Sequence, residues 1–228
     1  MIWTISTAVL VFLLSTWLGT KRHIKLDKIT GRRFLLASII ALLLFLVLRY
    51  INDLGYFPQP VAAAFMTNLY ASISGFFLGA AYDQYKMKKS LGAIQYVNSA
   101  FISELLPNLI ALTLIILGIA RTSILNELPI TPIRMASGLS LMTLGIYAIT
   151  LRITPEFRRK GFVILDREIP WKNLISYKWY EEQVIEIEFQ YQDLIHIHRS
   201  VVAPEDEKDV EQLLAKKMIE KMEKEADS

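Results

Sequence analysis

The sequence predicts an α-helical membrane bundle followed by a small α+β domain. Three observations support this fold class. Of the 228 residues, 53% are hydrophobic, whereas soluble domains reach about 45–50% even when Gly is counted. The apolar residues gather in long runs before residue 153. The last third of the chain instead alternates apolar with polar or charged side chains. We therefore expect a transmembrane domain at 1–157 and a soluble domain at 158–228.

The net charge of +3 combines two unlike parts. Residues 1–160 carry sixteen Lys and Arg against six Asp and Glu, which is +10, and residues 161–228 carry nine against sixteen, which is −7. The basic residues flank apolar runs rather than gather on a soluble face, so we expect no nucleic-acid partner. Cys is absent, which excludes disulfides, thiolate nucleophiles and thiolate metal ligands.

Five segments are long and apolar enough to cross a bilayer, which takes about 20 residues. These predicted spans are 2–19, 34–51, 61–82, 99–120 and 134–152. The first lacks the basic start and the A-x-A-like site of a cleaved signal peptide, so we expect it to be retained as a helix.

The charges between the spans predict the orientation of the bundle. Thirteen Lys and Arg follow the first, third and fifth spans, and three lie on the opposite side. Because cytoplasmic loops carry the excess of Lys and Arg, we expect the N-terminus outside and the C-terminal domain in the cytoplasm. Trp3 and Trp17 at the two ends of the first span agree with this, since indole rings favour headgroup depth.

The fourth span contains an ionisable residue, Glu104, with Pro107 and Asn108 three and four positions later. Ionisable groups at membrane depth are functional candidates, and this spacing places the three on one helix face. Together they could form a polar spot at a proline kink, as a transporter or proton path would use. The alternative is that Glu104 lies near the headgroups or pairs with a lysine of the preceding loop, and that Pro107 only kinks a packed helix.

The third span is rich in small and polar residues. Asn68 and Ser72 could line a polar cavity facing Glu104, or they could hydrogen-bond across packed helices. Gly75 and Gly79 form G-F-F-L-G, a spacing that lets helix backbones approach closely. We expect a central packing helix, and the same spacing would suit a homo-oligomer contact.

After residue 160 the hydrophobic period changes to two, which predicts strands. We expect them at 161–166, 174–181, 183–192 and 193–201, with turns at 181–183 and 192–193. In the last strand Ile195 and Ile197 alternate with His196 and His198, so the histidines are expected on the wet face. A final helix at 204–224 begins with Pro204 and acidic residues, and one apolar stripe should pack on the sheet. That stripe comprises Val210, Leu213, Leu214, Met218 and Met222.

This region also resembles a known kind of domain. The pattern consists of Gly161, Ile169-Pro170-Trp171, Leu174-Ile175, Tyr177, Trp179, Pro204-Glu205-Asp206, Val210, Leu213 and Leu214. Over roughly residues 158–218 it is similar to the C-terminal pleckstrin-homology-like domain of bacterial multi-pass membrane proteins of unknown function. The resemblance implies a docking or lipid-proximal module of a bacterial cytoplasmic membrane, without catalytic residues.

Two further interpretations concern the polar residues of the strands. His196 and His198 could ligate a metal with Glu186 or Glu188 of the neighbouring strand, but an ordinary solvated strand face is the simpler interpretation. Because the domain is acidic and the loops are basic, we expect the acidic face at Glu186 and Glu188 to dock on the basic loops or on a basic partner.

No Walker loop, G-x-S-x-G, H-E-x-x-H or Rossmann glycine pattern occurs. Our hypothesis is therefore a non-enzymatic integral membrane protein without a cofactor. Its partners would be the lipid bilayer and a protein or a second copy, bound through the cytoplasmic domain or the third span, as a subunit, scaffold or regulator. The alternative is a small transporter or channel with a polar site around Glu104, Asn108 and Asn68.

Overall fold

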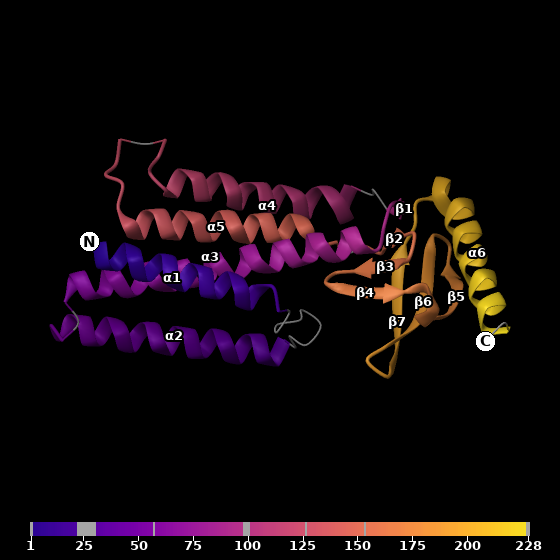
Figure 1. The fold of residues 1–228 in the computed structure, drawn as a ribbon, viewed down its shortest axis with the longest axis horizontal. Coiled ribbons are helices and arrows are strands. Elements are labelled where there is room, and N and C mark those ends of the chain that lie inside the picture. Colours follow the sequence, from indigo (N-terminus) through magenta and orange to yellow (C-terminus); the bar gives the residue numbers. More distant parts are fainter. Residues whose placement is uncertain are drawn as a thin grey trace. The chain divides into compact units, whose positions relative to one another are not determined.

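The computed structural model describes residues 2–21, 31–56, 58–97, 101–125, 127–152 and 154–226, without the side chains of residues 34, 37, 41, 101–104 and 225. The chain forms two compact units. The first comprises residues 1–83 and 109–150, and the second comprises residues 84–108 and 151–228. Figure 1 shows the elements of both units.

Helices form the N-terminal part of the chain, as predicted. They are α1 (Ile2–Gly19), α2 (Gly31–Asp53), α3 (Gln59–Ser90), α4 (Phe101–Arg121) and α5 (Pro132–Thr150). Within the described residues, α1, α2, α3 and α5 are long and apolar enough to cross a membrane, while the apolar part of α4, Leu105–Arg121, is shorter. The third helix extends eight residues beyond its predicted span and thereby contributes its last turns to the second unit.

In the first unit, α1 and α3 approach closely through glycines. A Cβ atom at Gly75 would overlap the carbonyl oxygen of Phe12, and one at Gly79 would overlap that of Thr16. No residue larger than Gly fits these positions unless the helices separate. The backbones therefore make direct contact, as small residues allow between membrane helices.

Hydroxyl groups then connect successive helices of this unit. Ser15 of α1 and Ser72 of α3 share a hydrogen bond of 2.9 Å between their Oγ atoms. On the same helix, Ser74 accepts a hydrogen bond of 3.4 Å from Thr143 Oγ1 of α5. Helix α4 lies against α5 at Gly118, where an added Cβ would overlap α5. These contacts place four of the helices in the spatial order α1, α3, α5, α4, and Figure 1 shows them as neighbouring helices.

The described residues of the second unit form two antiparallel sheets. The first contains, in spatial order, β1 (Ile94–Val97), β2 (Glu156–Arg158), β3 (Gly161–Ile164) and β4 (Arg167–Pro170). A short turn of helix, η2 (Trp171–Asn173), leads into the second sheet of β5 (Leu174–Glu181), β6 (Val184–Tyr191) and β7 (Leu194–Val201). After η3 (Pro204–Asp206), the chain ends with α6 (Glu207–Ala226).

The expected strands near 161–166 and over 174–201 and the final helix are confirmed. Strands β1, β2 and β4 were not predicted, because at three or four residues each they are too short to show a period of two. The predicted turn at 192–193 is a two-residue loop in which Gln192 and Asp193 both have positive φ. That conformation matches the type I′ turns that join antiparallel strands.

The core of the second unit lies between the two sheets and α6. Its buried side chains are Phe157, Phe162, Ile164, Ile169, Trp171, Leu174, Ile185, Ile187, Phe189, Val202, Val210 and Leu214. From α6, Val210 and Leu214 are fully buried, and each such burial stabilises the fold by about 1.5–3 kcal/mol. The expected stripe is wrong at Met222, which is 55% exposed, because it lies roughly 120° around the helix from Val210. The preceding residue, Lys221, still reaches the sheet at the Leu174 carbonyl oxygen.

A buried carboxylate, Glu156, connects the end of α3 to the first sheet. It lies 2.9 Å from Lys88 Nζ and also accepts a hydrogen bond from Arg158 Nε. The Arg158 guanidinium donates in turn to the carbonyl oxygens of Lys88 and Gly92, at 2.7 and 2.8 Å. Burial alone raises the pKa of Glu156, but the hydrogen bonds and charges of Lys88 and Arg158 outweigh it and hold that pKa below its ordinary value.

The contact between α1 and α3 can be tested with a disulfide. Because the chain has no Cys and the Ser15 and Ser72 Oγ atoms are 2.9 Å apart, Ser15→Cys/Ser72→Cys should close within one chain on mild oxidation. A faster-migrating monomer band on a non-reducing gel reports the bridge. Each single Cys variant is the control, and Gly79→Leu should abolish closure by separating the helices. A double variant that stays reduced would contradict the packing.

Removal of the buried charge should destabilise the second unit. Glu156→Gln leaves Lys88 and Arg158 without their carboxylate, and breaking a buried ion pair costs about 3 kcal/mol or more. The free energy of unfolding can be followed on the full chain in detergent by the fluorescence of Trp171 and Trp179, with Trp3 and Trp17 replaced by Phe. Glu223→Gln, at an exposed residue of α6, is the matched control. Equal losses for both variants would refute the role of Glu156.

Candidate functional site

The polar residues predicted to share a membrane site are distributed over both units. Asn68, Ser72, Gly75 and Gly79 belong to α3 in the first unit, whereas Asn108 belongs to the second unit. Ser72 is engaged by Ser15, as described above, and the two glycines lie against α1. The side chain of Glu104 lies outside the described residues.

Among these predicted site residues, Asn68 has a side-chain oxygen without a hydrogen-bond donor in the described part of the chain. Its Nδ2 donates 2.8 Å to the Ala64 carbonyl oxygen one turn earlier on α3. Its Oδ1 is buried and accepts no hydrogen bond from any described residue. A buried amide oxygen without a donor costs about 1–3 kcal/mol of folding free energy. Helix packing alone would therefore favour an apolar residue over Asn68 at this position.

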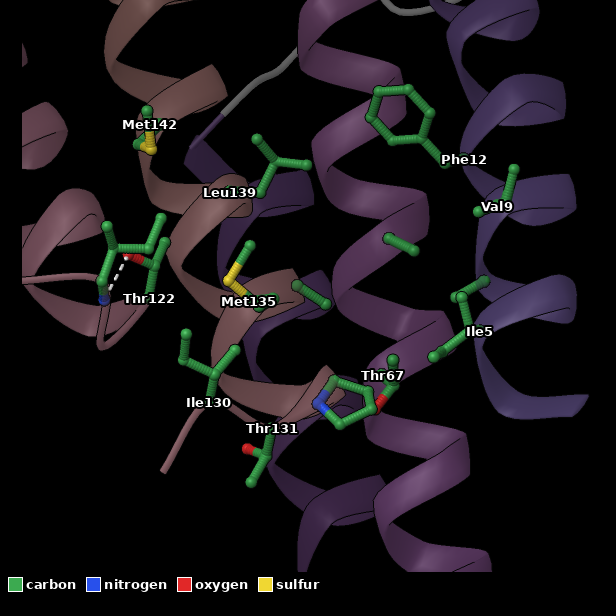
Figure 2. Close-up of a pocket in the computed structure, with 15 residues that line it drawn as sticks. Ile5, Val9, Phe12, Thr67, Thr122, Ile130, Thr131, Met135, Leu139 and Met142 are labelled. Atoms are coloured by element: carbon green, nitrogen blue, oxygen red, sulfur yellow. Dashed lines mark hydrogen bonds between the residues drawn. The ribbon is translucent and has the colours of Figure 1, made fainter. Parts of the chain in front are cut away.

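A cavity of about 560 Å³ lies in the first unit between α1, α3, α5 and the loop that follows α4 (Figure 2). Neither Asn68 nor Ser72 lines it. Its hydroxyl groups come from three threonines, and two of these are satisfied locally: Thr67 donates to the Ala63 carbonyl oxygen and Thr122 to that of Ile119. The remaining walls are aliphatic, sulfur-containing or aromatic, as Figure 2 shows for Ile5, Val9, Phe12, Ile130, Met135, Leu139 and Met142. Such a lining suits a hydrocarbon chain and offers little to a hydrated ion.

In the second unit, β7 presents its apolar residues in the direction opposite to the one predicted. His196 pairs with Phe189 and His198 with Ile187, so the histidines share the face of β6 that enters the core. Ile195 and Ile197 therefore point outward and are 64% and 62% exposed. The alternation itself was predicted correctly, but which side is buried depends on the register with β6.

This register also excludes the hypothetical metal set. Glu186 pairs with Arg199 and Glu188 with Ile197, which places both carboxylates on the outer face, away from His196 and His198. The ring of His196 instead stacks on Phe189 with centroids 5.7 Å apart. No group of three metal-ligating side chains occurs among the described residues.

The outer face of this sheet carries cations as well as Glu186 and Glu188. Glu186 forms ion pairs with Lys178 at 2.9 Å and Arg199 at 2.7 Å. Hydrogen bonds from Lys178 and Arg199 hold the pKa of Glu186 below its ordinary value. The Arg199 guanidinium also lies 3.8 Å from the ring centre of Tyr180. Glu186 is thus neutralised on site, and Glu188 accepts a hydrogen bond of 2.7 Å from Ser176 Oγ. The exposed isoleucines are the main apolar feature of this face.

Acid should destabilise the second unit through His198. Burial, and secondarily the charge of Arg167, lowers the pKa of His198, so the unfolded chain binds a proton that the folded chain does not. The contribution of His198 to the free energy of unfolding is therefore fully present above its pKa in the unfolded chain, about 6.5. It is lost as the pH drops from that value toward the lower pKa of the folded chain. Unfolding curves at several pH values measure this loss. His198→Gln should remove the step, and His23→Gln should retain it. A step that persists in His198→Gln would assign it to another group.

Comparison with known proteins concerns this second unit. Residues 153–219 match the family model described as Domain of unknown function (DUF5673). The match spans the strands from β2 to β7 and most of α6. Comparison with curated proteins and with solved structures gives no match.

Proposed function

We propose that this chain is a non-enzymatic integral membrane protein of a bacterial cytoplasmic membrane, with its N-terminus outside and a pleckstrin-homology-like C-terminal domain in the cytoplasm. The domain binds a protein through β7, so the protein acts as a subunit, scaffold or regulator. The apolar helices and the basic loops support the membrane location and the orientation.

The exposed strand β7 carries the proposal. It is eight residues long and has β6 as its one neighbour in the described sheet. Leu194, Ile195, Ile197 and Val201 on this strand are each more than half exposed. A long apolar edge strand is a hazard for aggregation unless something covers it, and strand addition by an extended peptide is a recurring way to cover one.

The chemistry of the edge favours a protein over the bilayer. The free side of β7 presents backbone N–H and C=O groups together with its apolar side chains. Hydrocarbon cannot satisfy these backbone groups, whereas a strand from another chain or a second copy satisfies them and covers the isoleucines at the same time. Ile195 and Ile197 would then set the specificity through alternate side-chain pockets.

A small transporter or channel has less support. The large cavity of the first unit is lined mainly by apolar groups, and the orphaned Asn68 Oδ1 does not open into it.

The proposal can be tested by photo-crosslinking the full chain in its native membrane. A benzophenone amino acid at Ile197 should give a defined adduct, either at twice the mass of the chain or at the mass of one other protein. The same amino acid at Lys208, an exposed position of α6, is the control. With the probe kept at Ile197, Ile195→Thr should weaken the adduct, because Thr keeps strand propensity but removes apolar area. Absence of a protein adduct, or equal adducts at both positions, would refute the proposal.

A further inference from the structure

The second unit contains a pocket whose lining is mainly basic and does not include β7. The pocket has a volume of about 580 Å³ and is formed by the turn between β2 and β3, the end of β4, η2 and the C-terminal half of α6. A volume of this size is typical of small-molecule sites. The cations that line it are Arg159, Lys160, Lys172, Lys217, Lys221 and Lys224.

This concentration of positive charge runs against the composition of the region. Residues 154–226 carry twelve Lys and Arg against sixteen Asp and Glu, a charge of −4. Half of those twelve cations nevertheless line one pocket, where Glu220 is the single carboxylate. The pocket thus has a net charge of +5 within an acidic region. Gathering like charges opposes folding, so the arrangement calls for a compensating anion.

Among the described residues, the fold supplies one carboxylate at this pocket, Glu220. Elsewhere in the unit, Arg158 is paired with Glu156, and Lys178 and Arg199 are paired with Glu186. In the pocket, Lys217 contacts Glu220 at 2.8 Å, and Lys221 donates to the Leu174 carbonyl oxygen at 2.7 Å.

The other four cations are available to a ligand. Among the residues that the structure describes, no side-chain hydrogen bond or ion pair involves Arg159, Lys160, Lys172 or Lys224. All four are exposed, so each can turn toward a bound anion.

The walls that carry these side chains are held in place by the backbone. The amides of Arg159 and Lys160 donate to the carbonyl oxygens of Ala93 and Leu91, at 3.0 and 3.1 Å. Trp171 donates from its indole to the Arg158 carbonyl oxygen at 2.9 Å and is nearly buried. The turn and η2 therefore form one supported edge of the site, which reduces the cost of ordering it around a ligand.

We propose that this pocket binds an anion carrying two or more phosphate groups. One phosphate would leave most of the +5 charge uncompensated, whereas two or more match it. Lysine and arginine are the side chains that bind phosphate oxygens by charge-assisted hydrogen bonds. The phosphates belong either to a soluble compound or to a lipid headgroup, and the site is independent of the partner bound at β7.

Lysine footprinting of the full chain in nanodiscs tests the proposal and separates the two sources. Acetylation rates of individual lysines are measured by mass spectrometry in phosphatidylcholine alone, with added inorganic pyrophosphate, and with cardiolipin, whose headgroup carries two phosphates. We expect slower labelling of Lys172, Lys217 and Lys224 with pyrophosphate, with cardiolipin or with both, and unchanged labelling of Lys208. Protection by pyrophosphate alone identifies a soluble ligand, and protection by cardiolipin alone identifies a lipid. Protection by neither, or equal protection of Lys208, overturns the proposal.

A charge-removal pair gives a second readout. Lys172→Gln/Lys224→Gln should weaken the apparent affinity of the protecting anion by about tenfold or more, as judged by the protection of Lys217. The matched control is Lys208→Gln, on the same helix but outside the pocket. Both lysines of the pair are exposed, so the fold should tolerate their replacement. An affinity unchanged in the double variant overturns the assignment to this pocket. The result at β7 is unaffected in either case, so the two proposals fail separately.

Discussion

The buried carboxylate of Glu156 is the interaction on which the second unit depends. It holds Lys88 from the end of α3 and Arg158 from its own strand, and Arg158 also binds the backbone at Lys88 and Gly92. Residues more than sixty positions apart in sequence therefore share one charge centre. Because the charges are buried, loss of any partner leaves an uncompensated ion, so the three groups stabilise the unit only together.

Arg158 connects this charge centre to the proposed phosphate site. The Arg158 carbonyl oxygen accepts the indole hydrogen bond of Trp171, which positions η2 beside the β2–β3 turn. Strand β1 pairs with β2 at the same place, so a segment between two apolar helices becomes an edge of the domain's first sheet. The second unit thus combines the C-terminal region with residues 84–108, which the expected boundary at 157/158 does not anticipate.

Charge is distributed differently over the two faces of interest. On the outer face of the second sheet, Glu186 is neutralised by Lys178 and Arg199, and the exposed isoleucines remain. In the basic pocket, four cations find no carboxylate among the described residues. Among the described residues, an apolar edge strand with one neighbour and a pocket with six cations and one carboxylate are complementary to different ligands, a polypeptide strand and a phosphate-bearing compound.

The sequence by itself determined the apolar helices, the longer strands and the final helix, because each is specified by a local period of hydrophobic residues. It also identified Asn68, Ser72, Gly75 and Gly79 as notable positions. Only the tertiary structure decided which side of β7 is buried, because a period of two is the same whichever face enters the core. It also decided that Glu186 is neutralised and that six cations from three segments meet in one pocket. Those facts depend on strand register and on contacts between residues distant in sequence, which no local pattern encodes.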